Sequence, residues 1–171
     1  MFSDPVSNLA KLGIGVGMKV VDLGAGSGFY TFEAAKMVGP TGRVYSVDVV
    51  KEMLERLRSV GATNGLRNIE VVWGNCEKIG GTKLGEAVAD RVIASNILFQ
   101  VEKPDEFVLE IKRILKPGGK VLIVDWSEVS ALSPVNLVTS TKAQMMFEKA
   151  GFKMENSFNA GNHHYGLILT R

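Results

Sequence analysis

Short apolar runs alternate with longer amphipathic segments along the chain. The runs are rich in Val and Ile and are bounded by Gly, Asp or Asn, a pattern typical of short buried strands. They predict strands at residues 19–23, 43–48, 69–73, 91–95, 120–125, 152–158 and 164–170. Strands buried on both faces and separated by helices favour a parallel sheet, because each parallel neighbour needs a crossover connection.

Helical periodicity marks several of the segments between these strands. Asp4 before Pro5 predicts the start of a short helix, which Gly13 ends. A capping box at Thr141 and Gln144 predicts a later helix start. One apolar stripe per helix is formed by Met53, Leu54, Leu57 and Val60, by Phe107, Ile111, Ile114 and Leu115, and by Ala143, Met146, Phe147 and Ala150.

The connections complete the expected architecture. Residues 126–139 are predicted to form the one long loop, and one helical turn is expected near Leu84. Only a few residues separate the sixth strand from the last, so these two strands should form a hairpin and the last should run antiparallel. We therefore expect one domain over residues 1–171 with a three-layer α/β/α sandwich fold. Residues 1–17 should form a short amino-terminal helix, which with Phe2 is a candidate lid.

Composition excludes several classes of protein. The formal net charge is only +2, and the 20 Lys and Arg are scattered among 18 Asp and Glu, so no nucleic acid partner is expected. Cys76 is the single cysteine, and no CxxC or HExxH spacing exists, so we expect no disulfide, no metal site and a cytoplasmic location. No signal peptide or bilayer-length apolar run is evident, so no membrane insertion is expected.

The stretch VVDLGAGSGFYT, residues 20–31, follows the first predicted strand. Gly24, Gly26 and Gly28 remove side chains that would keep a ligand from the backbone, at the edge where ligands bind in such sheets. The helix after them offers N–H groups to an anionic ligand group. Asp48 ends the second strand about 20 residues further on, where a carboxylate can accept hydrogen bonds from ribose hydroxyls. The pattern predicts a nucleoside site.

A dinucleotide is one candidate ligand for this site. Its fingerprint is G-x-G-x-x-G or A, but here Phe29 stands at the third small position. Asp22 precedes the glycines, where its charge would repel a pyrophosphate but would hold an ammonium group or fix the loop. A ligand with an amino-acid end and a ribose, such as S-adenosylmethionine, suits these residues better. An NAD-dependent dehydrogenase stays the alternative.

The whole chain resembles the class I S-adenosylmethionine-dependent methyltransferases, in the broad group that includes the ubiquinone and menaquinone biosynthesis enzymes. The resemblance lies in VVDLGAGSG, VYSVDVV, VVWGNCE, RVIASNILFQV and ILKPGGKVLIVDW. It implies a Rossmann-like, seven-stranded, mostly parallel sheet whose antiparallel last strand lies between the fifth and sixth. It also implies that Gly24 and Gly26 hold the methionine end, Asp48 the ribose, Asn75 and Cys76 the adenine, and that Ser95 and Asn96 lie near the sulfonium.

From these arguments we expect one set of cofactor-binding residues: Asp22, Gly24, Ala25, Gly26, Gly28, Asp48, Val49, Asn75, Cys76, Ser95 and Asn96. Asn75 departs from the family, in which many members carry an aspartate at this position. An asparagine oxygen still accepts from the adenine amino group, without charge assistance. We expect weaker anchoring of adenine and the same ligand.

The methyl carbon of a sulfonium is already electrophilic, so methyl transfer does not always require a catalytic base. Some acceptors, however, must lose a proton. His163 and His164 lie in the turn before the last strand, at the cofactor edge, and are the candidate catalytic residues. They point to opposite faces, so at most one faces the pocket. A small or lipidic organic acceptor is expected by analogy with the family. The pocket should be open, and a large acceptor, the amino-terminal segment or a second subunit would cover it. A non-catalytic cofactor-binding subunit is a further alternative.

Overall fold

Helices and strands alternate through most of the chain, as the apolar pattern predicts. The computed structural model describes residues 3–127 and 133–171, so the predicted lid residue Phe2 and part of the 126–139 loop lie outside the described residues. In chain order the elements are α1 (Pro5–Leu12), β1 (Lys19–Leu23), α2 (Phe29–Val38), β2 (Arg43–Asp48), α3 (Lys51–Thr63), β3 (Ile69–Trp73), β4 (Ala89–Ser95), a 3-10 turn (Leu98–Gln100), α4 (Pro104–Ile114), β5 (Leu115–Trp126), α5 (Ser140–Lys149), β6 (Lys153–Gly161) and β7 (His164–Thr170).

The strands form one sheet in the order β3-β2-β1-β4-β5-β7-β6. Neighbouring strands from β3 to β5 are parallel, whereas β7 pairs antiparallel with both β5 and β6. The expected sheet, its hairpin and its antiparallel last strand are confirmed. Parallel strands place their carboxyl ends at one edge, and the chain leaves β1, β2, β3 and β4 at that edge.

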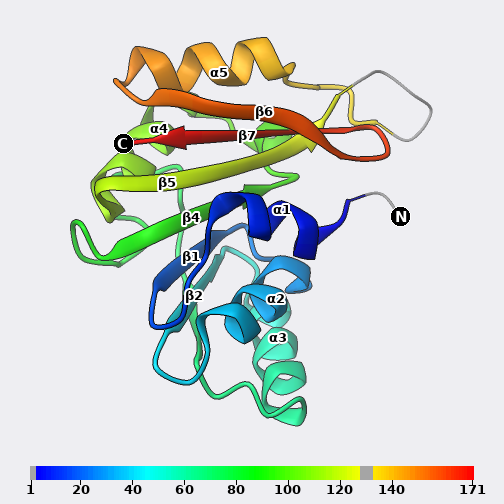
Figure 1. Cartoon of the computed structure of the whole chain (residues 1–171), viewed down its shortest axis with the longest axis vertical. Helices are drawn as coiled ribbons and strands as arrows, with labels where there is room; N and C mark the ends of the chain where they lie inside the picture. The colour runs from blue at the N-terminus through cyan, green and yellow to red at the C-terminus, as the bar shows by residue number, and fades with distance from the viewer. Residues whose placement is uncertain (1–2, 128–132) are drawn as a thin grey trace.

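Helices cover both faces of the sheet (Figure 1). On one face α1 and α2 pack through Leu9, Leu12, Ala34 and Val38, and α3 lies beside them. On the other face α4 and α5 pack against the sheet through a second apolar core that includes Phe107. The predicted three-layer α/β/α sandwich is therefore confirmed, and the first turn of α1 lies at the edge where β1 ends.

Several local predictions are wrong. Helix α5 is capped by Thr139 and not by Thr141, so it begins earlier than the capping box suggests; Thr139 is extended and its Oγ1 accepts from Lys142 N at 3.3 Å. The stripe on α3 is narrower than expected, since Met53 and Val60 are each 37% exposed.

The connection between β3 and β4 also differs from its prediction. In the described chain, no helix forms near Leu84, and residues 74–88 make a long irregular connection. The 126–139 loop is therefore not the one long loop. The sequence of the 74–88 segment has no helical or strand periodicity. Tertiary contacts hold this segment in place instead.

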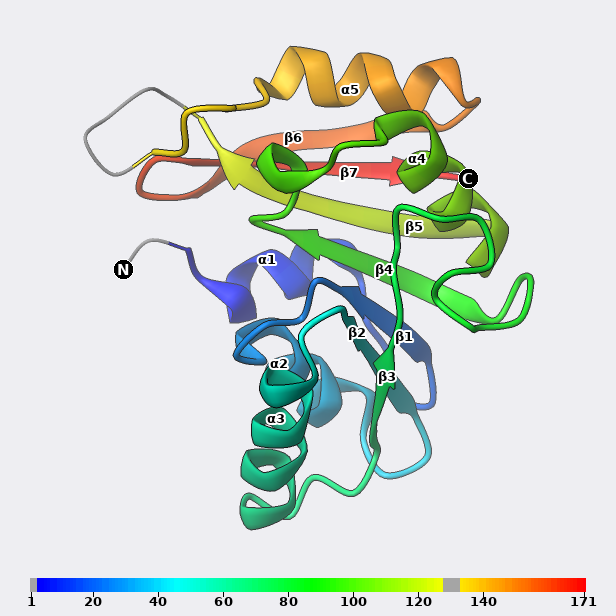
Figure 2. The same ribbon diagram turned by 180° about the vertical axis from the view of Figure 1, so that it is seen from behind.

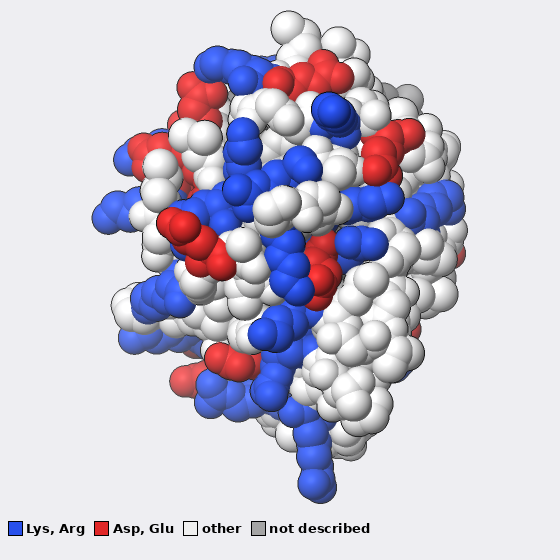
Figure 3. Space-filling model, turned by 60° about the vertical axis from the view of Figure 1, so that its left-hand side comes forward, with Lys and Arg blue, Asp and Glu red and all other residues white. Residues whose placement is uncertain are grey.

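Charges on the surface are mixed, as the composition predicts. Figure 3 shows Lys and Arg side chains gathered on one side of the molecule with Asp and Glu side chains among them. Ion pairs between opposite charges include Lys116 with Asp90 and Lys120 with Glu155, each at 2.6 Å. Among the described residues, no helix has the length and apolar character needed to cross a bilayer.

Candidate active site

A cleft of about 1000 Å³ opens where β1, β2, β3 and β4 end. Most of the predicted cofactor residues line it. The lining is formed by Ser3, Pro5, Asp22, Gly24, Ala25, Gly26, Ser27, Phe29, Tyr30, Asp48, Val49, Val50, Met53, Gly74, Asn75, Cys76, Glu77, Ser95, Asn96, Ile97 and Gln100. Of the predicted set, Gly28 alone is absent from this lining, and the lining residues that the sequence did not single out include Ser3, Tyr30 and Gln100.

The turn after β1 forms the floor of the cleft. Gly24, Gly26 and Gly28 have φ values of 66°, 50° and 86°, a region that side-chain-bearing residues rarely adopt. A Cβ on Gly24 would lie 2.6 Å from the Ile97 side chain, so this glycine is needed for Ile97 to pack against the turn, whereas a Cβ on Gly26 would meet only Gly24 O at 3.8 Å and leaves the backbone bare at the cleft.

Gly28 has a different role from the one predicted for it. It does not line the cleft, and a Cβ there would lie 2.9 Å from the Phe32 ring and 3.0 Å from Leu57 Cγ. The expectation that Gly28 bares the ligand site is therefore wrong. This glycine lets α2 and α3 pack closely.

Asp22 is a buried acid at the end of β1 and lines the cleft, although it is only 2% exposed. The Thr31 hydroxyl donates to its Oδ2 at 2.6 Å and also lies 2.9 Å from Ser46 Oγ. Burial raises the pKa of Asp22 to about 7. The hydrogen bond from Thr31 lowers this pKa, and the nearby charge of Asp48 raises it by a smaller amount. A carboxyl group held in this state ionises readily when a cation arrives beside it.

Asp48 joins the two turns that frame the cleft. Its Oδ2 accepts from Gly26 N and its Oδ1 from Val50 N, each at 2.9 Å. Each carboxylate oxygen can accept a further hydrogen bond, so these contacts leave capacity for a pair of hydroxyls. The side chain therefore fixes the glycine turn and presents acceptors to the cleft.

Asn75, Cys76 and Glu77 form the opposite wall, just after β3. Asn75 Oδ1 accepts from Glu77 N at 2.8 Å, which makes a local turn. Cys76 is 8% exposed, and burial raises the pKa of its thiol to about 12, so the thiol stays neutral. This wall offers an amide and a small apolar surface.

Ser95 ends β4 and Asn96 follows it, and both line the cleft. Asn96 has a positive φ of 53°, and its N–H donates to Val124 O at 2.8 Å. Its side chain meets His164 Nε2 at 2.9 Å, while His164 Nδ1 lies 2.8 Å from Asn162 O. Both ring nitrogens of His164 therefore have oxygen partners, Asn162 O at Nδ1 and Asn96 Oδ1 at Nε2.

The two candidate catalytic histidines lie outside the cleft lining. His164 is 2% exposed, and its ring lies 4.6 Å from that of Trp126. His163 is half-buried, and its carbonyl accepts from Ser127 N at 2.8 Å. The structure therefore places His164 behind Asn96, where it can orient that side chain.

Tyr30 belongs to a polar cluster that the sequence did not reveal. Asn8, buried on α1, donates to Tyr30 OH at 2.9 Å, to Ser3 Oγ at 3.1 Å and to Ala160 O at 3.1 Å. Burial raises the pKa of Tyr30, so its hydroxyl stays protonated at the cleft. The cluster brings the amino-terminal segment to the site through partners far apart in the chain.

The charge of the lining decides what kind of ligand fits. Of the described residues that line the cleft, Asp22, Asp48 and Glu77 are acidic and none is Lys, Arg or His. A pyrophosphate would meet carboxylates without a compensating cation, whereas a ligand that carries positive charge would be stabilised. The rim adds apolar surface through Phe29, which is 74% exposed, and Val49, which is 58% exposed.

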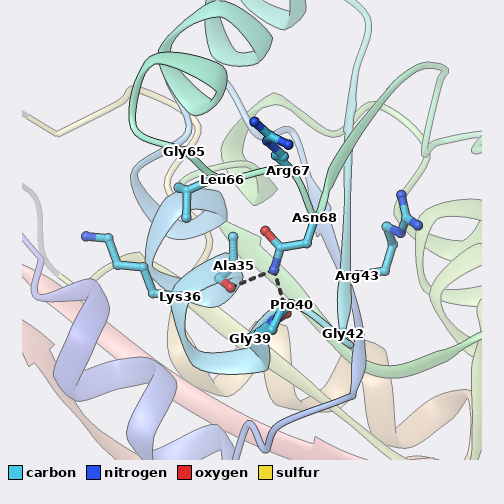
Figure 4. Close-up of a pocket in the computed structure, with 10 residues that line it drawn as sticks. All are labelled: Ala35, Lys36, Gly39, Pro40, Gly42, Arg43, Gly65, Leu66, Arg67 and Asn68. Carbon is cyan, nitrogen blue, oxygen red and sulfur yellow. Dashed lines mark hydrogen bonds between the residues drawn. The ribbon is translucent and has the colours of Figure 1, made fainter.

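A second hollow, of about 400 Å³, lies at the end of α2 and is lined by Lys36, Arg43 and Arg67 among others. In Figure 4 these three cations point in different directions. Asn68 fills the space between them and donates to Ala35 O at 2.7 Å and Gly39 O at 2.8 Å. The Asn68 amide thus satisfies backbone carbonyls at the carboxyl end of α2. We assign this hollow a structural role and no ligand.

Comparison with known proteins agrees with the geometry of the cleft. The sequence model of a family described as "Methyltransferase domain" matches residues 14–165. A crystal structure of a SAM-dependent methyltransferase from Aquifex aeolicus superimposes with a TM-score of 0.90 and 29% identity, over 99% of this chain and 90% of that one.

Two curated relatives are longer than this chain. The arsenite methyltransferase of Halobacterium salinarum is 35% identical over 64% of this chain and 27% of its own length. The ubiquinone/menaquinone biosynthesis C-methyltransferase of Pasteurella multocida is 31% identical over 81% of this chain and 51% of its own length. The chain thus spans between about a quarter and a half of the curated relatives that it matches.

Proposed function

This chain belongs to the class I S-adenosylmethionine-dependent methyltransferases, and we propose that it transfers the methyl group of S-adenosylmethionine to a small or lipidic organic acceptor. The observation that carries the proposal is the cleft itself. Its floor is bare backbone, its charged lining is acidic throughout, and its rim is apolar. A sulfonium nucleoside with an ammonium group matches the floor, and an apolar acceptor matches the rim.

The acidic lining disfavours the dinucleotide alternative. NAD carries a pyrophosphate, and Phe29 occupies the place of the small residue that its fingerprint needs. In contrast, the pKa of about 7 at Asp22 suits an ammonium group, which would draw the proton off this carboxyl.

Each part of the cleft has a proposed task. The turn at Gly24, Ala25 and Gly26 would receive the methionine end, with Asp22 beneath its ammonium group. Asp48 would accept from the ribose hydroxyls. The adenine would lie between Val49 and the wall of Asn75 and Cys76, and Ser95 and Asn96 would line the space beside the sulfonium. These assignments are supported by the position of the residues in one cleft.

Positioning is the main contribution that the protein would make to the reaction. The sulfonium supplies an electrophilic methyl carbon, so the residues must hold the acceptor in line and exclude water. Positioning of this kind accounts for about 7–11 kcal/mol of a barrier. Tyr30 and Ser3 close one side of the cleft beside Ser95 and are suited to exclude water there.

The rim favours an organic acceptor over a metalloid. One relative is named for arsenite and another for ubiquinone and menaquinone biosynthesis. A soft metalloid prefers thiolate ligands, but Cys76 is the only cysteine and its thiol stays neutral. Exposed Phe29, Val49 and Val50 instead provide an apolar surface at the mouth. We therefore propose an apolar acceptor. A cytoplasmic location and a second subunit that covers the cleft remain predictions.

Transfer of a labelled methyl group tests this proposal. The protein is incubated with methyl-labelled S-adenosylmethionine and a panel of hydroquinones with and without isoprenoid tails, simple phenols, short amines and arsenite. We expect label in an apolar organic product. Label in arsenite alone would overturn the proposed acceptor class. Cofactor binding without transfer to any acceptor would instead support the non-catalytic subunit.

His164 gives a prediction about the base. Replacing it with Gln should slow methyl transfer by about 10- to 100-fold, because Asn96 loses its support beside the sulfonium. The pH profile of turnover should keep the parent shape, since the ring does not line the cleft. Loss of one limb of the profile would show that His164 acts as a base, and His163→Gln tests the other histidine in the same assay.

A further inference from the structure

We propose that Glu110, on α4 and outside the cleft, is a positioning residue that fixes the adenine wall by holding the 80–82 turn; this inference rests on the proposed function. Glu110 is completely buried, on the face of α4 that also carries Phe107, Ile111 and Ile114. A carboxylate buried there needs several partners to offset its desolvation, and it has them.

The partners of Glu110 come from two places. On its own helix, Arg113 donates from Nε and from Nη2, each at 2.8 Å. From the 74–88 connection, Gly80 N donates to Oε2 at 2.7 Å, Thr82 N donates to Oε1 at 3.2 Å, and the Thr82 hydroxyl donates to Oε1. Burial alone would raise the pKa of Glu110, but these hydrogen bonds together hold it below its ordinary value, so the group is ionised.

The turn that Glu110 holds is in direct contact with the cleft wall. Gly81, between the two held residues, accepts from Asn75 N at 3.0 Å. The two backbone stretches touch so closely that a Cβ on Gly81 would lie 2.1 Å from Asn75 O, and one on Gly74 would lie 2.5 Å from Gly81 O. A shift of the turn must therefore move Asn75, and Cys76 with it.

A second carboxylate ties the same segment to the other end of the helix. Glu77 Oε2 accepts from Glu102 N at 2.7 Å and from Lys103 N at 2.9 Å, just before α4 begins. Figure 2 shows the segment after β3 passing from the cleft edge to α4 before it returns to β4. The segment has no regular structure of its own, so these two carboxylates supply the order that a helix or strand would otherwise provide.

The arrangement predicts a specific loss of binding. Glu110→Gln keeps the size of the side chain, but its amide nitrogen cannot accept from Gly80 N and faces the Arg113 guanidinium. The adenine wall then loses its fixed position, although the side chain at position 110 does not line the cleft. A residue that acts at this distance changes affinity by about 3- to 30-fold.

Titration calorimetry with two nucleosides tests the proposal, well below the melting temperature of each variant. The probes are S-adenosylhomocysteine and 5′-methylthioadenosine, which share the adenosine and differ in the amino-acid end. We expect Glu110→Gln to weaken both by the same factor, and Thr82→Val, which removes one donor to Glu110, to weaken both by a smaller factor. Glu155→Gln, at a surface pair with Lys120, is the matched control and should bind like the parent.

The outcomes separate this inference from the proposed function. A folded Glu110→Gln variant with parent affinity for both probes overturns the positioning role, whatever its melting temperature. If that variant does not fold, Thr82→Val decides, and parent affinity in it overturns the role. If the parent itself binds neither nucleoside, it is the proposed function that fails.

Discussion

Asp22→Asn should make the protein more stable at pH 8 and at the same time weaken its binding of S-adenosylmethionine. Asp22 is buried with a pKa of about 7, whereas an unfolded aspartate has a value of 3.8. Because the folded pKa is the higher one, the stability that this group contributes is complete below about pH 4 and is lost as the pH rises through 7. Three pKa units correspond to about 4 kcal/mol.

Urea unfolding of the parent and the variant, without ligand, measures this effect. The difference in the free energy of unfolding should be near zero at pH 4 and should grow to about 2–4 kcal/mol in favour of the variant at pH 8. Asp105→Asn, at an exposed pair with Lys149, is the control and should shift stability little at either pH. A difference that does not depend on pH would contradict the buried, proton-linked state of Asp22.

Binding by the same variant should change in the opposite direction. An ammonium group loses its carboxylate partner, which costs about 1.5–3 kcal/mol, or roughly 10- to 150-fold in affinity. S-adenosylhomocysteine should lose this factor in calorimetry. Methylthioadenosine, which lacks the amino-acid end, should bind as it does to the parent. An equal loss for both ligands would place the ammonium group elsewhere.

Asp48→Ala should weaken the binding of every adenosine ligand. The carboxylate accepts from Gly26 N and Val50 N, so its removal frees the glycine turn as well as the ribose hydroxyls. Unpaired hydrogen-bonding groups cost about 1–3 kcal/mol, and the two effects together should reach roughly 100-fold in affinity.

Calorimetry with S-adenosylhomocysteine, methylthioadenosine and adenosine measures the effect of Asp48→Ala. All three ligands carry the ribose, so all should weaken together. Glu52→Ala, an exposed carboxylate in the first turn of α3, is the control. Parent affinity in Asp48→Ala would show that the ribose binds at another place.

The sequence predicted those parts of the site that follow from strand order. Asp22, Gly24 and Asp48 each come directly at or after the end of a strand, and parallel strands end at one edge, so their meeting is dictated by local pattern. The sheet and its antiparallel last strand were predictable for the same reason, since short links and apolar runs are visible in the chain.

Other parts depend on contacts that no local pattern displays. The Asn8 side chain joins Tyr30 to Ala160, from opposite ends of the chain, so the polar cluster at the cleft could not be read from spacing. Whether a glycine faces a ligand or a neighbouring helix is likewise a tertiary question. A Cβ on Gly28 would meet Phe32 and Leu57, whereas one on Gly26, two residues earlier in the same turn, would meet only Gly24 O at 3.8 Å.

The position of Glu110 in the sequence was informative, although a search for apolar residues alone does not detect it. It falls at the helical spacing of Phe107, Ile111 and Ile114, so a charge occupies a position on the buried face. Such a residue is a reason to search for a partner. Here the partners lie in the 74–88 segment, the part of the chain with the weakest sequence pattern.

The most direct test of the whole account is a calorimetric titration of the parent with S-adenosylmethionine and with NAD under the same conditions. An acidic cleft over a bare glycine turn predicts saturable binding of the sulfonium nucleoside, at one site per chain, and no heat from NAD. Binding of NAD without binding of S-adenosylmethionine would contradict it.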